Sequence, residues 1–114
     1  MYQIDFSHPS SVYFVGIGGV SMSALAELLA DAGFQVSGSD RSRSPLTDVL
    51  ESKGIKVFYG QRAENITDSI DCVVFTSAIR PDNPEYAAAH AKNLPCLTRG
   101  QLMGQIMRNY DIPI

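Results

Sequence analysis

The chain of 114 residues has little of what marks secreted, membrane-spanning or nucleic-acid-binding proteins. Its two cysteines, Cys72 and Cys96, lie in apolar segments without CxxC spacing, so we expect buried free thiols in a reducing compartment. No apolar run approaches the roughly 20 residues that cross a bilayer, and the first residues do not resemble a signal peptide. The net charge of −3 argues against general nucleic-acid binding, which needs a basic surface. These absences predict a cytoplasmic protein.

The motifs of common catalytic centres are also missing. The sequence has no GxSxG nucleophile elbow, no GxxxxGK[ST] phosphate loop and no spacing typical of metal ligands. The two histidines, His8 and His90, have no aspartate or cysteine at catalytic spacing and are expected at the surface. We therefore expect no catalytic residue, no metal site and no cofactor held by this chain itself.

What the sequence does contain is a regular alternation of short apolar runs and amphipathic segments. Ser44-Pro45 and Asn83-Pro84 are typical helix starts, and Gly33 is typical of a helix end. Met103 and Met107 recur at helical spacing and are expected in the core. The pattern predicts strands at residues 12–15, 34–40, 55–59, 72–75 and 94–97, and helices at 21–32, 45–53, 84–91 and 101–109.

This alternation predicts an α/β fold, a Rossmann-like open parallel sheet of about five strands with helices on both faces. The length and the 45% of hydrophobic residues fit one folded domain over residues 1–114. Residues 112–114 have the pattern of a further strand, so we expect the sequence to continue beyond its last residue.

A glycine-rich turn follows the first predicted strand, in the sequence Gly16-Ile17-Gly18-Gly19-Val20-Ser21. It matches the dinucleotide-binding pattern GxGxxG with serine in place of the third glycine. Gly16 permits a tight turn, Gly18 lets the backbone approach phosphates, and the first amides of the next helix point at the anion. We expect this loop to hold a diphosphate.

Two further strand ends carry polar groups at the same edge of the sheet. Asp40 ends the second strand, where an acid accepts hydrogen bonds from ribose hydroxyls, and Arg41 or Arg43 is expected near a phosphate. The segment Thr76-Ser77-Ala78-Ile79 follows the most apolar strand and faces the same crevice. Hydroxyls and amides at that tip either contact a ligand or simply form the turn before the next helix.

These motifs together resemble the N-terminal domain of the Mur ligases, and among them the members that join L-alanine to UDP-N-acetylmuramate. The resemblance rests on residues 14–23, 36–40 and 76–79, on Asp82-Asn83-Pro84, and on Arg99 with Met107-Arg108. Where the family commonly has Gly-His after the third strand, this chain has Gly60-Gln61. Where the family often has an acid after the arginine of the last segment, this chain has Arg99-Gly100.

The resemblance implies a role in peptidoglycan synthesis. In such enzymes the first domain binds the UDP-sugar, a central domain uses ATP and Mg²⁺, and a third domain binds the amino acid. This chain would be the first domain only, inactive alone, with an ATP loop of the GTHGKT type following beyond residue 114. The resemblance assigns the UDP-N-acetylmuramate site to Gly16, Ile17, Gly18, Gly19, Val20, Ser21, Asp40, Arg41, Thr76, Ser77, Ala78 and Ile79.

Three alternatives stay open. An NAD-binding domain of an oxidoreductase would use the same loop, with Asp40 on the ribose. A regulatory or interaction domain would keep the fold without a ligand. A relative within the family, which reattaches recycled tripeptide to UDP-muramate, shares the same motifs. The Gly18-Gly19 doublet and Ser21-Met22-Ser23 favour the UDP-sugar.

Overall fold

The computed structural model describes residues 1–109, and the prediction for 112–114 lies outside them. Strands and helices alternate in the predicted order. The elements are β1 (Ser11–Val15), α1 (Val20–Asp31), β2 (Gln35–Asp40), α2 (Pro45–Ser52), β3 (Lys56–Tyr59), the short 3₁₀ helix η1 (Ala63–Asn65), β4 (Cys72–Phe75), α3 (Pro84–Ala91), β5 (Cys96–Thr98) and α4 (Arg99–Asn109).

The five strands form one parallel sheet in the order β3-β2-β1-β4-β5. β1 lies at its centre with β4 beside it, and in this pair Val12 lies opposite Cys72 and Phe14 opposite Val74. Both strands are nearly continuous apolar runs, as expected of parallel strands that are covered on both faces. The predicted fold class is confirmed.

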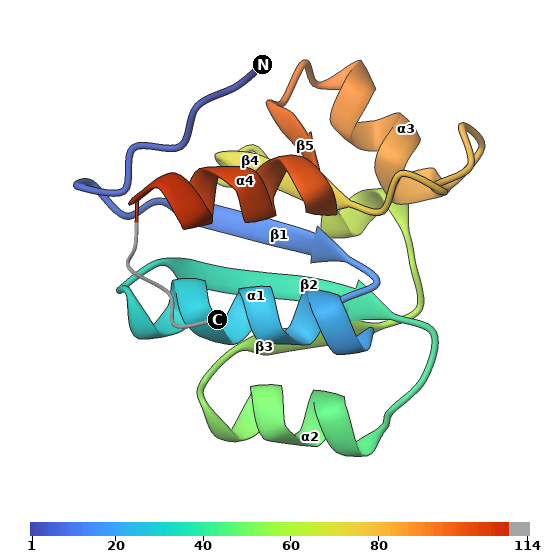
Figure 1. The fold of residues 1–114 in the computed structure, drawn as a ribbon. Coiled ribbons are helices and arrows are strands. Elements are labelled where there is room, and N and C mark those ends of the chain that lie inside the picture. The colour runs from blue at the N-terminus through green and yellow to red at the C-terminus, as the bar shows by residue number, and fades with distance from the viewer. Residues whose placement is uncertain (110–114) are drawn as a thin grey trace.

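Helices cover both faces of the sheet. One face packs against α1, α2 and α4, through side chains such as Leu29, Leu50 and Leu102, all fully buried. The opposite face packs against α3 and the segment around η1, through Ala89 and Ile66. Figure 1 shows α1 and α4 running along one side of the sheet, with α3 set apart from them. None of the helices among residues 1–109 is long and apolar enough to cross a membrane.

Gly38 in β2 allows the glycine loop to pack closely on the sheet. A β-carbon at this position would lie 2.8 Å from Cβ of Ile17 and would also overlap the carbonyl oxygen of Phe14. Ile17 is fully buried, so its side chain is an anchor of the loop in the core. The contact between β2 and the loop therefore requires glycine.

The last helix and strand differ from their predicted bounds. α4 begins at Arg99 rather than Gln101, because Thr98 and Gln101 form a reciprocal cap: the Thr98 amide donates to Gln101 Oε1 (2.9 Å) and the Gln101 amide to Thr98 Oγ1 (3.1 Å). β5 covers Cys96–Thr98 rather than 94–97. Met107 is 56% exposed, so its predicted core position is wrong, whereas Met103 packs against the core.

The N-terminal arm is held to α4 by a buried side chain. Gln105 is 1% exposed; its Nε2 donates to the Tyr2 carbonyl (2.7 Å), and its Oε1 accepts from the Ile4 amide (2.9 Å). Ile4 itself belongs to the core cluster beneath α1 and α4. The first residues of the chain are therefore part of the packed domain.

Candidate functional site

A crevice opens where the strand order reverses. The connections after β1 and β4, two neighbouring strands, lead to helices on opposite faces, and this leaves a gap at the carboxyl ends of those strands. An open cavity of about 670 Å³ lies there. It is lined by Val15, Gly16, Arg41, Gln61, Thr76, Ala78, Ile79, Arg80, Asp82, Asn83 and Pro84.

Only part of the sequence-predicted site lines this cavity. Gly16, Arg41, Thr76, Ala78 and Ile79 do so. The remaining predicted residues do not line it, and the side chain of Ile17 is buried in the core instead. These residues belong to the glycine loop, the start of α1, the end of β2 and the tip after β4; they are Ile17, Gly18, Gly19, Val20, Ser21, Asp40 and Ser77.

The amides of the glycine loop are already used within the protein. Those of Gly16 and Ile17 donate to the Ser39 carbonyl (2.9 and 2.8 Å), and that of Gly19 donates to the Gly16 carbonyl (3.3 Å). The amide of Gly18 donates to Oδ2 of Asp40 (2.8 Å). The loop is thus a rigid turn whose own donors face inward.

The amides open to an anion are those that follow, in the first turn of α1. Gly19 is the N-cap and has no side chain to cover them, and the turn contains no acid. Within residues 1–109 the amides of Val20, Ser21 and Met22 have no acceptor. With the positive end of the helix dipole behind them, these amides can attract an anion at the start of α1.

Asp40 closes the loop with its carboxylate. Oδ2 accepts from the Gly18 amide and Oδ1 from the Arg41 amide (2.7 Å). Each carboxylate oxygen retains lone pairs for a further donor, so the group can still accept from a ribose hydroxyl. The position of the Asp40 carboxylate explains why residue 18 is glycine, because a β-carbon there would lie 2.5 Å from Asp40 Oδ2.

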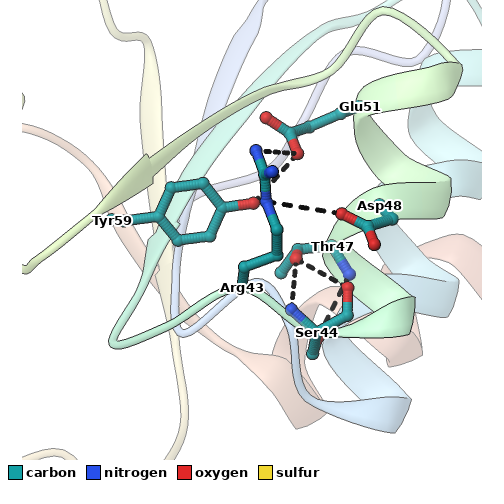
Figure 2. A network of polar contacts seen from close by, with 6 residues as sticks. All are labelled: Arg43, Ser44, Thr47, Asp48, Glu51 and Tyr59. Atoms are coloured by element: carbon teal, nitrogen blue, oxygen red, sulfur yellow. Dashed lines mark hydrogen bonds and ion pairs between the residues drawn. The ribbon is translucent and has the colours of Figure 1, made fainter.

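The two arginines after β2 have different surroundings. Arg41 lines the cavity. Arg43 turns away to α2 and β3: its guanidinium pairs with Asp48 (3.5 Å) and Glu51 (3.5 Å) and lies 5.5 Å from the ring centre of Tyr59, as Figure 2 shows. Of the two candidates for a phosphate contact, only Arg41 is placed at the crevice.

The tip after β4 and the start of α3 form the opposite wall. The Ile79 amide donates to the Thr76 carbonyl (3.1 Å), which closes the predicted turn. Asn83 caps α3 and its Nδ2 donates to Oε1 of Gln61 (2.7 Å). Gln61 stands where the family commonly has histidine, and here its amide joins the two sides of the cavity.

Two polar residues at this edge were not predicted as site residues. Arg99, at the start of α4, donates from Nη1 to Oγ of Ser21 (3.1 Å), which places a cation beside the first turn of α1. Glu85, in the first turn of α3, is fully buried behind the cavity. The Asn-Pro-Glu sequence indicates a helix start, but no local pattern indicates that its acid is buried.

No group of three or more His, Cys, Asp or Glu side chains that could hold a metal ion occurs within the part of the chain that the structure describes. Cys72 is buried and Cys96 half-buried, and both are free thiols.

Comparison with known proteins identifies the family. Residues 11–111 match the model of the Mur ligase family, catalytic domain. The chain is 60% identical over its whole length to the UDP-N-acetylmuramate–L-alanine ligase of Agathobacter rectalis, but spans only 25% of that protein. It thus covers about a quarter of the length of the curated relatives it matches.

Comparison with solved structures points to the same family. The UDP-N-acetylmuramate–alanine ligase of Thermotoga maritima superposes with a TM-score of 0.83 at 34% identity, over 90% of this chain and 23% of that one. The UDP-N-acetylmuramate:L-alanyl-gamma-D-glutamyl-meso-diaminopimelate ligase of Neisseria meningitides gives 0.78 at 28% identity, over 86% and 31%. An NAD⁺ complex, Bordetella bronchiseptica WbmH, gives only 0.52 at 25% identity, over 76% and 37%. The chain belongs to the Mur ligase family.

Proposed function

We propose that this chain is the UDP-N-acetylmuramate-binding part of an ATP-dependent UDP-N-acetylmuramate–L-alanine ligase of peptidoglycan synthesis. The observation that carries the proposal is the 60% identity, over the whole chain, to a relative of that name. The crevice supports it, because an open cavity adjoins a helix start with free amides. That combination suits a ligand with a nucleoside and a diphosphate.

The chemistry of the crevice supports one arrangement of the ligand in this proposal. The uridine occupies the cavity between Arg41 and the tip that contains Thr76, Ser77, Ala78 and Ile79. The diphosphate lies on the first turn of α1, at Val20 and Ser21, and the turn formed by residues 16–19 sets its distance from the sheet. A free lone pair of Asp40 accepts from a ribose hydroxyl.

The chemical step belongs to the complete enzyme. There ATP with Mg²⁺ supplies the phosphoryl group that activates the muramate carboxylate, and the amine of L-alanine then attacks the acyl carbon as phosphate leaves. The residues of this chain contribute binding and orientation, and they hold the UDP end of the substrate while its carboxylate reacts elsewhere. A cytoplasmic location suits these substrates and the two free thiols.

Calorimetric titration of the chain with UDP, UDP-N-acetylmuramate and NAD tests this function. We expect both uridine nucleotides to bind at least about tenfold more tightly than NAD. Tighter binding of NAD, or no binding of UDP, would refute it. In the complete enzyme, phosphate release with L-alanine but not with the recycled tripeptide is expected, and the reverse preference would assign it to the recycling relative.

A further inference from the structure

Glu85 is a fully buried carboxylate surrounded by hydrogen-bond donors. Its Oε2 accepts from Tyr13 Oη (2.7 Å), Asn65 Nδ2 (2.8 Å) and the Arg62 amide (3.2 Å). Its Oε1 accepts from Ser39 Oγ (2.5 Å). No cation pairs with it among the described residues, so four neutral donors and the positive end of α3 replace the water that it has lost.

These donors come from three separate parts of the chain, which are β1, β2 and the segment after β3. Ser39 lies in β2, and its carbonyl receives the amides of Gly16 and Ile17. Arg62 and Asn65 belong to the segment after β3, and Asn65 Nδ2 also donates to the Gly60 carbonyl (3.1 Å). Glu85 is therefore one bond from the residue that holds the glycine loop.

The same residue is tied to the opposite wall of the cavity. The main-chain amide of Glu85 donates to Oδ1 of Asn83 (2.9 Å), and Asn83 Nδ2 in turn donates to Oε1 of Gln61. Both Asn83 and Gln61 line the cavity. Glu85 lies at the start of α3, and its side chain connects this wall of the crevice to Ser39 behind the glycine loop and to the segment 60–65.

Stability alone does not account for a carboxylate here. A buried charge without a cation costs desolvation, and an apolar side chain of similar volume often packs at least as favourably. What an apolar residue cannot supply is directional acceptance of four donors from separate segments. We propose that Glu85 is a positioning residue, which fixes the walls of the crevice in the geometry that receives the nucleotide end of the substrate. This inference rests on the proposed function.

The test compares Glu85→Gln with Glu64→Gln, its matched control. Glutamine keeps the shape of the side chain, but an NH2 group takes the place of one carboxylate oxygen. Because this NH2 group is a donor, the variant cannot accept from all four partners. Glu64 is an exposed acid in η1, so its variant removes the same charge nearby without touching the network. Calorimetry with UDP and with UDP-N-acetylmuramate is done at a temperature where circular dichroism shows each variant folded.

We expect Glu85→Gln to weaken both ligands by the same factor, about tenfold or more, because Glu85 backs the nucleotide site that both share. Glu64→Gln should stay within about twofold of the unmodified chain. Tyr13→Phe distinguishes a loss of positioning from a loss of stability. Tyr13 is held inside the sheet, so this variant should lower the free energy of unfolding and leave the affinity for both ligands unchanged. An affinity that falls in proportion to stability in both variants would overturn the inference.

A second variant decides the case if Glu85→Gln does not fold. Asn65→Ala removes one donor from a partly buried position and should weaken UDP about threefold in a folded protein. Unchanged UDP affinity in Asn65→Ala, or in folded Glu85→Gln, overturns the inference about Glu85 and leaves the proposed function standing. If the unmodified chain binds neither UDP nor UDP-N-acetylmuramate, the proposed function fails, and this inference fails with it.

Discussion

Replacing Gly18 by alanine should destabilise the domain through Asp40. The added β-carbon would lie 2.5 Å from Asp40 Oδ2 and 3.0 Å from Thr47 Cγ2, so the carboxylate must leave and its bond to the Gly18 amide is lost. Hydrogen bonds to charged groups contribute about 1.5–3 kcal/mol. The lower end applies here, because both groups are only partly buried and water replaces the partner.

The shift of fully buried Thr47 adds about 1 kcal/mol to this cost, and the reduced freedom of the unfolded chain offsets roughly 0.4–1 kcal/mol. The net loss is about 1.5–2 kcal/mol, which for a domain of this size lowers Tm by roughly 6–8 °C. Thermal and urea unfolding followed by circular dichroism measure it. Gly19→Ala is the control: its β-carbon would meet nothing closer than 3.7 Å, so it should cost less than about 1 kcal/mol.

A double-mutant cycle tests the reason as well as the size. Asp40→Ser shortens the side chain out of reach, so Gly18→Ala should cost little in that background. Equal costs of Gly18→Ala with and without Asp40→Ser would refute the reasoning. The structure thus adds a second reason for glycine at this position to the expected close approach of phosphate, because a side chain there would meet Asp40.

Three more outcomes are expected. Gly38→Ala should cost about 3 kcal/mol or more in urea unfolding, because its β-carbon overlaps the glycine-loop anchor and a β1 carbonyl; a cost below about 1 kcal/mol would contradict this. Ser44→Ala removes the N-cap of α2 shown in Figure 2 and should cost about 1 kcal/mol, whereas Asp48→Asn, which breaks an exposed ion pair, should cost less than about 0.5 kcal/mol; equal losses would argue against the cap. Burial, with smaller contributions from neighbouring groups, raises the pKa of Cys72 from 9.0 to about 12 and raises that of Tyr13 above 10.0, so both ionise more readily when unfolded. Stability present below about pH 9 should therefore be lost as the pH rises toward 12, and Cys72→Ala should flatten urea-unfolding free energies measured between pH 8 and 11; a profile that is flat in the unmodified chain would refute the shifts.

Local sequence patterns predict most of the fold, because the start and end of a helix or strand depend on residues close to one another in the sequence. The starts of α2 and α3 follow from Ser44-Pro45 and Asn83-Pro84, and both caps form. The predicted start of α4 is two residues late, although a Thr-x-x-Gln capping signal is present at Thr98.

The candidate site was less predictable, since its bonds join residues far apart in the sequence. The position of Asp40 after a strand indicates a site edge, but not that its carboxylate binds the Gly18 amide. Arg41 and Arg43 are equally good candidates for a phosphate contact in the sequence. Only the position of α2, where Arg43 pairs with Asp48, leaves Arg41 as the arginine at the cavity. The burial of Glu85 depends on three segments that meet in space.

The hold of Gln105 on the N-terminal arm sets a limit on trimming the protein. The family match begins at residue 11, yet the arm before it satisfies both ends of a buried amide and covers part of the core. A chain that starts at Ser11 would leave that amide without partners and expose the apolar side of α4. The smallest unit that folds well is therefore longer at its beginning than the region by which the family is identified.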